Sequence, residues 1–146
     1  MLDIEEKLKE IRRTEDIWVA GPAGNNQIAE LEARLGTLPD SYKIFLNNYG
    51  ALSIGDYHIS GITGPDLEEG GGSVVFDTNR FVEEYGLPNH LVIIQADEES
   101  PYCLDLSAPG SEKPVVCFEL FSKKIKVLSA NFDEWLNHIL SLRVNG

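Results

Sequence analysis

Two clusters of carboxylates are the residues of this chain best placed to do chemistry. One cluster lies in a glycine-rich segment and the other lies between two strand-like runs: Asp66, Glu68 and Glu69, and Asp97, Glu98 and Glu99. Paired carboxylates act as general acid and base only when burial moves their pKa values apart. Carboxylates in polar turns are usually solvated. A solvated loop or a protein-binding surface is therefore expected for each cluster, with catalysis as the lesser alternative.

The same side chains do not form a recognisable metal site. Calcium loops place carboxylates in DxDxDG spacing, which the chain lacks. The three histidines, His58, His90 and His138, fall on an expected strand, turn and helix without the paired spacing of zinc ligands. We therefore expect no bound metal.

Nucleotide binding and nucleophilic catalysis are also disfavoured. Gly70, Gly71 and Gly72 precede an expected helix, but a phosphate-binding loop continues with Lys and Ser or Thr, whereas Ser73-Val74-Val75 follow here. The acidic residues before these glycines would repel a phosphate. A GxSxG nucleophile motif is absent from the chain. We expect neither a cofactor nor enzymatic activity.

The overall charge indicates the kind of partner. The chain carries 12 Lys and Arg against 24 Asp and Glu, a formal net charge of -12. Nucleic-acid recognition needs a basic patch, so a nucleic-acid partner is not expected. An acidic surface instead attracts basic proteins and speeds their encounter.

Length and hydropathy predict one domain spanning residues 1–146. The chain has 146 residues, of which 42% are hydrophobic and 25% charged, as is ordinary for a folded protein with a sizeable core. It lacks the run of about 18 apolar residues that a membrane span requires. Its first residues, MLDIEEKLKEIRR, are charged and contain no apolar signal-peptide segment. The cytoplasm is the expected location.

Helices are predicted where apolar residues recur every three or four positions. The pattern predicts helices over residues 2–13, 26–35, 39–49, 73–85 and 131–144. Asn25 or Asn26 is the expected cap of the second helix, and Pro39 is expected in the first turn of the third. The segment TEDIWVAGPAGNN, residues 14–26, is predicted to be a loop.

Strands are predicted in two groups. Residues 52–54 and 57–59 are expected to form a hairpin around Gly55-Asp56. The runs LVIIQAD, PYCLDLS, VVCFEL and KIKVLSA are expected to form an antiparallel meander. The predicted fold is therefore α+β, with a central, largely antiparallel sheet of about six strands and helices packed around it.

The order of these segments resembles the SMI1/KNR4 family of the SUKH superfamily. Leu38-Pro39, Tyr42, Phe45-Leu46 and Tyr49-Gly50 match its typical pattern before the first strands. Later segments also look like the family, namely NRFVEEYGLPNHLVIIQAD, PYCLDLS, PVVCFE and the closing NFDEWLNHIL. The resemblance covers roughly residues 25–142, with the helix over 2–13 preceding this core.

The resemblance implies a mixed α+β domain without an established set of catalytic residues. Bacterial members are mostly immunity proteins that bind and block a cognate toxin, often a nuclease, whereas fungal relatives act as interaction hubs. The expected function is therefore an immunity protein whose acidic face occludes the active cleft of a basic toxin. The six carboxylates of the two clusters are the expected contacts. A non-catalytic regulatory or scaffold module is the alternative, and the oligomeric state is left open.

Overall fold

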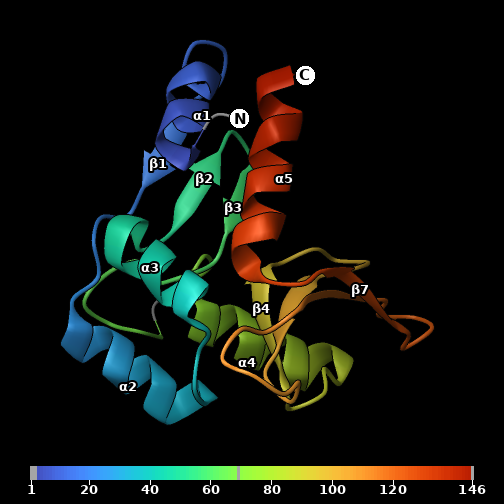
Figure 1. The fold of residues 1–146 in the computed structure, drawn as a ribbon. Coiled ribbons are helices and arrows are strands. Elements are labelled where there is room, and N and C mark those ends of the chain that lie inside the picture. The colour runs from blue at the N-terminus through green and yellow to red at the C-terminus, as the bar shows by residue number, and fades with distance from the viewer. Residues whose placement is uncertain (1–2, 69, 146) are drawn as a thin grey trace.

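The computed structural model describes residues 3–68 and 70–145, and these ranges contain five helices and two antiparallel sheets (Figure 1). The helices are α1 (Ile4–Ile11), α2 (Asn25–Leu35), α3 (Asp40–Tyr49), α4 (Val74–Tyr85) and α5 (Phe132–Asn145). The strands are β1 (Ile17–Val19), β2 (Leu52–Ile54), β3 (Tyr57–Ile59), β4 (Leu91–Gln95), β5 (Tyr102–Asp105), β6 (Val115–Phe118) and β7 (Ile125–Ser129). The α+β class predicted from the sequence is confirmed.

The first sheet has three strands in the order β1-β2-β3. The predicted hairpin of β2 and β3 is confirmed, with Ser53 opposite His58. The prediction of a loop over residues 14–26 is wrong in part, because Ile17–Val19 pairs with β2 as an edge strand. A strand of three residues is too short to show alternation, so only the pairing with β2 identifies it.

The second sheet is the predicted antiparallel meander, in the order β4-β5-β6-β7. The prediction of one central sheet of about six strands is wrong, because β3 and β4 belong to different sheets. Between them the chain runs through residues 60–73 and the whole of α4 before it returns to the sheet region. Hairpin connections made the β2-β3 pair and the meander predictable, whereas this long connection carried no signal of where β4 would pair.

Two helix starts differ from the prediction. The N-cap of α2 is Gly24 rather than an asparagine, and its backbone N–H donates to Gln27 Oε1 at 3.2 Å. Pro39 is the N-cap of α3 and precedes its first turn. Glycine is acceptable at an N-cap, which allows both asparagines to enter the first turn of α2.

Buried side chains form two cores on opposite faces of the second sheet. The apolar run of β4 is continuous because its residues alternate between them. Val92 and Ile94 join the larger core, and Leu91 and Ile93 join the smaller core under α4. A strand covered on both faces is expected to be apolar throughout.

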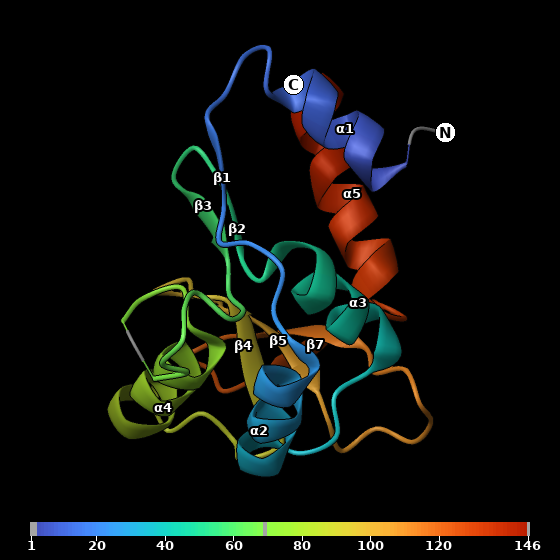
Figure 2. The same ribbon diagram turned by 90° about the vertical axis from the view of Figure 1, so that its left-hand side faces the viewer.

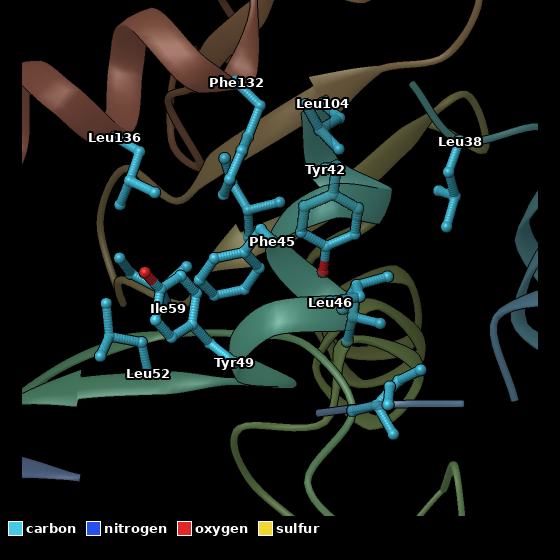
Figure 3. Packing of buried hydrophobic residues seen from close by; sticks show 14 of the residues in the cluster. Leu38, Tyr42, Phe45, Leu46, Tyr49, Leu52, Ile59, Leu104, Phe132 and Leu136 are labelled. Carbon is cyan, nitrogen blue, oxygen red and sulfur yellow. The ribbon is translucent and has the colours of Figure 1, made fainter. Parts of the chain in front are cut away.

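Aromatic side chains of α3 and α5 make the centre of the larger core. The ring centroids of Tyr42 and Phe132 are 5.0 Å apart, and those of Phe45 and Phe132 are 5.2 Å apart (Figure 3). Trp135 continues this cluster at 5.7 Å from Phe132. Aromatic pairs at these distances add to the energy of area burial. Figure 2 shows α5 running alongside α1, while α4 and α2 lie at the other end of the molecule.

A close crossing of two backbone segments joins these parts. Gly50, which ends α3, accepts a hydrogen bond at its carbonyl oxygen from the Ile62 N–H at 2.8 Å. Gly61 donates its N–H to Gly72 O and accepts from Val74 N–H, both at 2.9 Å. A Cβ atom on Gly61 would lie 1.8 Å from Gly50 O. Only glycine fits at position 61, because the obstructing atom belongs to the backbone.

We expect Gly61→Ala to lower the free energy of unfolding by roughly 3 kcal/mol, since the two segments must separate to admit a methyl group. Gly71→Ala is the matched control, because a Cβ there meets no atom within 4 Å. Urea denaturation of both variants measures the difference. Equal stability of the two variants would contradict the close crossing.

Candidate functional site

Helix α4 lies between the two acidic clusters predicted from the sequence. Its N-cap is Ser73, whose Oγ accepts from Phe76 N–H at 3.3 Å, and Gly86 ends it in the left-handed conformation. Its apolar stripe, which includes Val74 and Phe81, faces the core. The opposite side of the helix and the neighbouring loops form what we name the α4 surface: Glu68, Phe76, Asn79, Arg80, Glu83, Glu84 and Glu98.

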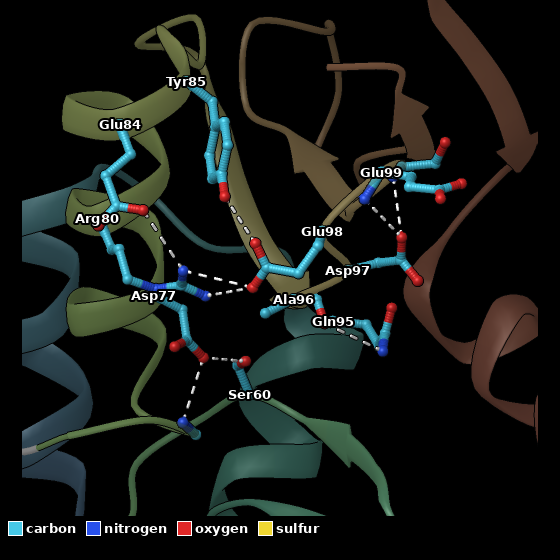
Figure 4. A network of polar contacts seen from close by, with 12 residues as sticks. Ser60, Asp77, Arg80, Glu84, Tyr85, Gln95, Ala96, Asp97, Glu98 and Glu99 are labelled. Carbon is cyan, nitrogen blue, oxygen red and sulfur yellow. Dashed lines mark hydrogen bonds and ion pairs between the residues drawn. The ribbon is translucent and has the colours of Figure 1, made fainter. Parts of the chain in front are cut away.

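Arg80 organises the α4 surface. Its guanidinium lies 3.4 Å from Glu98 Oε1 and 3.6 Å from Glu84 Oε2, so it ties the loop after β4 to the helix (Figure 4). Tyr85 donates its hydroxyl to Glu98 Oε2 at 2.6 Å. This hydrogen bond raises the pKa of Tyr85, because ionised Tyr85 would lose it and face the Glu98 carboxylate.

The predicted contact residues differ in the partners of their carboxylates, some of which pair with an arginine while others accept a hydrogen bond within their own turn. Glu68 lines the hollow of the α4 surface and pairs with Arg34 of α2 at 3.4 Å, and Glu98 reaches the same surface through Arg80. Asp66 instead accepts the N–H of Glu68 at 2.9 Å and shapes its own turn.

The remaining predicted residues do not join this surface. Asp97 Oδ1 accepts the N–H groups of Glu99 and Ser100, both at 2.9 Å, and so holds its turn. Figure 4 shows Glu99 on the other side of that loop from Glu98. Glu69 lies outside the residues that the structure describes.

Asp77 is a potential site residue that the sequence analysis missed. The residue is 4% exposed, and its Oδ2 accepts from Ser60 Oγ at 2.6 Å and from Gly72 N–H at 3.2 Å. Burial raises the pKa of Asp77, although both hydrogen bonds and the neighbouring Arg80 and His58 act in the opposite direction. The sequence did contain a signal for this burial. Asp77 lies one turn before Phe81 on the apolar stripe of the helix, and an acidic residue at such a position must be buried.

A cleft of about 590 Å³ opens beside Asp77, between the first sheet and α4. Trp18 and His58 line it from the sheet, and Asp77 and Arg80 line it from the helix. Trp18 is 51% exposed, and the His58 ring is hydrogen-bonded to Ser53 Oγ at 2.6 Å. We name this feature the Asp77 cleft. Arg80 also belongs to the α4 surface, so the cleft and the surface are continuous.

The two features combine exposed aromatic side chains with carboxylates and few cations, which is the chemistry of a protein-binding surface. Among the residues of these two features, Trp18 is 51% exposed and Phe76 is 38% exposed. Within residues 3–68 and 70–145, no three His, Cys, Asp or Glu side chains gather in a way that could hold a metal ion. Over the same residues, no helix has the length and apolar character needed to cross a membrane.

A family model described as SUKH_5, SMI1-KNR4 cell-wall, matches residues 1–141 of the 146-residue chain. The match begins before α1 and ends within α5. It therefore includes α1, which lies before the segments that carry the resemblance in the sequence. The resemblance inferred from the sequence is confirmed.

The buried carboxyl of Asp77 predicts a pH-dependent stability. Its pKa in the folded protein is raised above the ordinary value of 3.8, so the folded state holds the proton more tightly than the unfolded chain. The resulting stabilisation is complete below the unfolded pKa and is lost as the pH rises through the folded pKa. We therefore expect Asp77→Asn to gain stability relative to the unmodified protein as the pH rises from about 4 upward.

Urea denaturation across this pH range measures the effect. The amide oxygen of the variant still accepts from Ser60 and Gly72, so the structural bonds are retained. Asp56→Asn, in the exposed turn between β2 and β3, controls for the loss of one carboxylate. A constant difference between Asp77→Asn and the unmodified protein would contradict the raised pKa.

Proposed function

Because this chain belongs to the SUKH_5 family of SMI1-KNR4 proteins, we propose that it is an immunity protein that binds a cognate toxin and covers the toxin's active cleft. Family membership fits an immunity-protein type of role in general, and the family is generally non-catalytic. The proposed partner is a basic protein, in particular a nuclease, since a nuclease cleft must attract phosphates.

The observation that carries the proposal is an exposed aromatic side chain set among carboxylates on one helix. Phe76 lies on the α4 surface with Glu68, Glu83 and Glu84 around the same hollow. Protein interfaces commonly place an aromatic anchor in a desolvated centre and charged residues at its rim. Phe76 is the proposed anchor.

The charge of the surface supports a basic partner. Carboxylates outnumber guanidinium groups on the α4 surface, where Arg80 and the neighbouring Arg34 lie among Glu68, Glu83, Glu84 and Glu98. The chain as a whole carries a net charge of -12. Such a field mainly sets the rate and selectivity of association, while the desolvated anchor supplies affinity. A stable complex of this kind buries about 800 Å² on each partner.

The first experiment is co-expression with the C-terminal domain encoded by the adjacent gene. Host survival together with a one-to-one complex on co-purification is the expected result. Cell death, or survival without a complex, would contradict the proposal for that partner. A regulatory scaffold module would then be the better description of the chain.

Variants of the α4 surface test the proposed contacts. We expect Phe76→Ala to weaken the complex by about 2 kcal/mol, as loss of an aromatic anchor does. Glu83→Lys is expected to weaken it as well, by reversing a charge that has no ion pair within 4 Å among the described residues. Isothermal titration calorimetry measures both affinities.

Glu6→Lys on α1 is the matched control, because it makes the same charge change at an exposed residue far along the chain from the site. Its affinity should equal that of the unmodified protein. Unchanged affinity in both Phe76→Ala and Glu83→Lys would exclude the α4 surface as the contact.

Association is expected to depend on salt. The rate constant should fall by about tenfold between 50 and 500 mM NaCl, since salt screens the attraction between exposed charges. Stopped-flow measurement of Trp fluorescence gives the rate, and Glu83→Lys should show a weaker dependence. A rate that does not change with salt would exclude electrostatic steering by this surface.

A further inference from the structure

We propose that the Asp77 cleft is a socket for an arginine side chain of the partner protein. This inference rests on the proposed function, because the basic toxin would supply the arginine. It concerns a cavity that adjoins the α4 surface, and it names the chemical group that the cavity receives. The argument depends on the carboxylate at its floor, the aromatic side chain at its wall and the surrounding charges.

The carboxylate of Asp77 is held in place with one oxygen available. Oδ2 accepts both hydrogen bonds, from Ser60 Oγ and from Gly72 N–H. Figure 4 shows the second oxygen of Asp77 without a partner among the residues drawn. The residue is 96% buried but lines the cleft, so a ligand in the cleft can reach its carboxyl group. A carboxylate fixed in this way binds a donor without first losing side-chain freedom.

Trp18 provides a surface on which a guanidinium group can stack. The side chain is half exposed on the edge strand β1 and lines the cleft. Guanidinium groups bind to indole faces by cation–π attraction, and arginine does so more often than lysine. Gly71 also lines the cleft, and a Cβ built on it would meet no atom within 4 Å, so a ligand has open space there.

The charges around the cleft favour a cation. Arg80 lies on the wall, but its guanidinium already pairs with Glu84 and Glu98. Asp77 has no ion pair within 4 Å among the described residues, and an arriving guanidinium would provide one. An anion would instead be repelled by the negative charge of the buried carboxylate. The planar fork of arginine also matches a carboxylate better than the ammonium of lysine does.

Free amino-acid derivatives test the socket without any toxin. N-acetyl-arginine amide is titrated into the ¹⁵N-labelled protein, and its citrulline analogue, which has the same shape without the charge, is the matched ligand. We expect saturable shifts of the Gly72 N–H and the Trp18 indole N–H with the arginine derivative alone. Equal binding of both derivatives, or shifts that spare these two groups, would overturn the inference.

Substitution of the floor residue gives the second measurement. We expect Asp77→Asn to weaken binding of N-acetyl-arginine amide by about tenfold or more, because the ion pair is lost. Asp133→Asn in the exposed first turn of α5 should bind as the unmodified protein does. Unchanged binding by Asp77→Asn would also overturn the inference, and the comparison with citrulline holds whether or not this variant folds well.

The socket and the immunity function fail in different ways. If the toxin complex forms with full affinity but N-acetyl-arginine amide does not bind at Asp77, the socket is wrong and the function stands. If the amide binds at Asp77 but no adjacent toxin is neutralised, the cleft retains its arginine specificity and the proposed function is wrong.

Discussion

Ser60 is the residue on which the arrangement of the molecule depends. Its N–H donates to Ile94 O of β4 at 2.7 Å, and its carbonyl oxygen accepts from the Tyr42 hydroxyl of α3 at 2.7 Å. Its own hydroxyl donates to Asp77 of α4. Three elements that are distant in the sequence therefore meet at one buried residue at the end of the first sheet. Buried polar groups must be paired, so these bonds are costly to lose and specify a single arrangement.

The neighbouring glycine makes this arrangement possible. Gly61 allows the chain to pass against Gly50 at a distance that any side chain would prevent. The crossing brings the end of the first sheet, the end of α3 and the start of α4 together. It also limits the pairing of the two sheets. Beyond the bond from Ser60 N–H to Ile94 O, the chain turns away from β4, because Gly61 and Ile62 bond to Gly72, Val74 and Gly50 instead.

The proposed binding features follow from the same arrangement. Asp77 is held by Ser60 on one side and by the glycine loop on the other, which positions α4 and opens the cleft beside it. One turn of helix further on, Arg80 faces both the cleft and the outer surface, where it holds Glu98. A partner that placed an aromatic contact on Phe76 and an arginine beside Asp77 would use two faces of one rigid helix. Rigid placement of contacts lowers the entropy lost on binding.

The sequence by itself determined the elements whose patterns are local. The apolar stripes of α1 and α3, the hairpin at Gly55-Asp56 and the four-strand meander are all set by residues a few positions apart, and the family pattern follows their order. The sequence also identified Glu68 and Glu98 as acidic candidates. Only the tertiary structure decided that β1 is a strand, that the strands form two sheets, and that Asp77 and Trp18 line one cleft. These features depend on contacts between residues far apart in the chain, and hydrophobic periodicity reports only on neighbours along it.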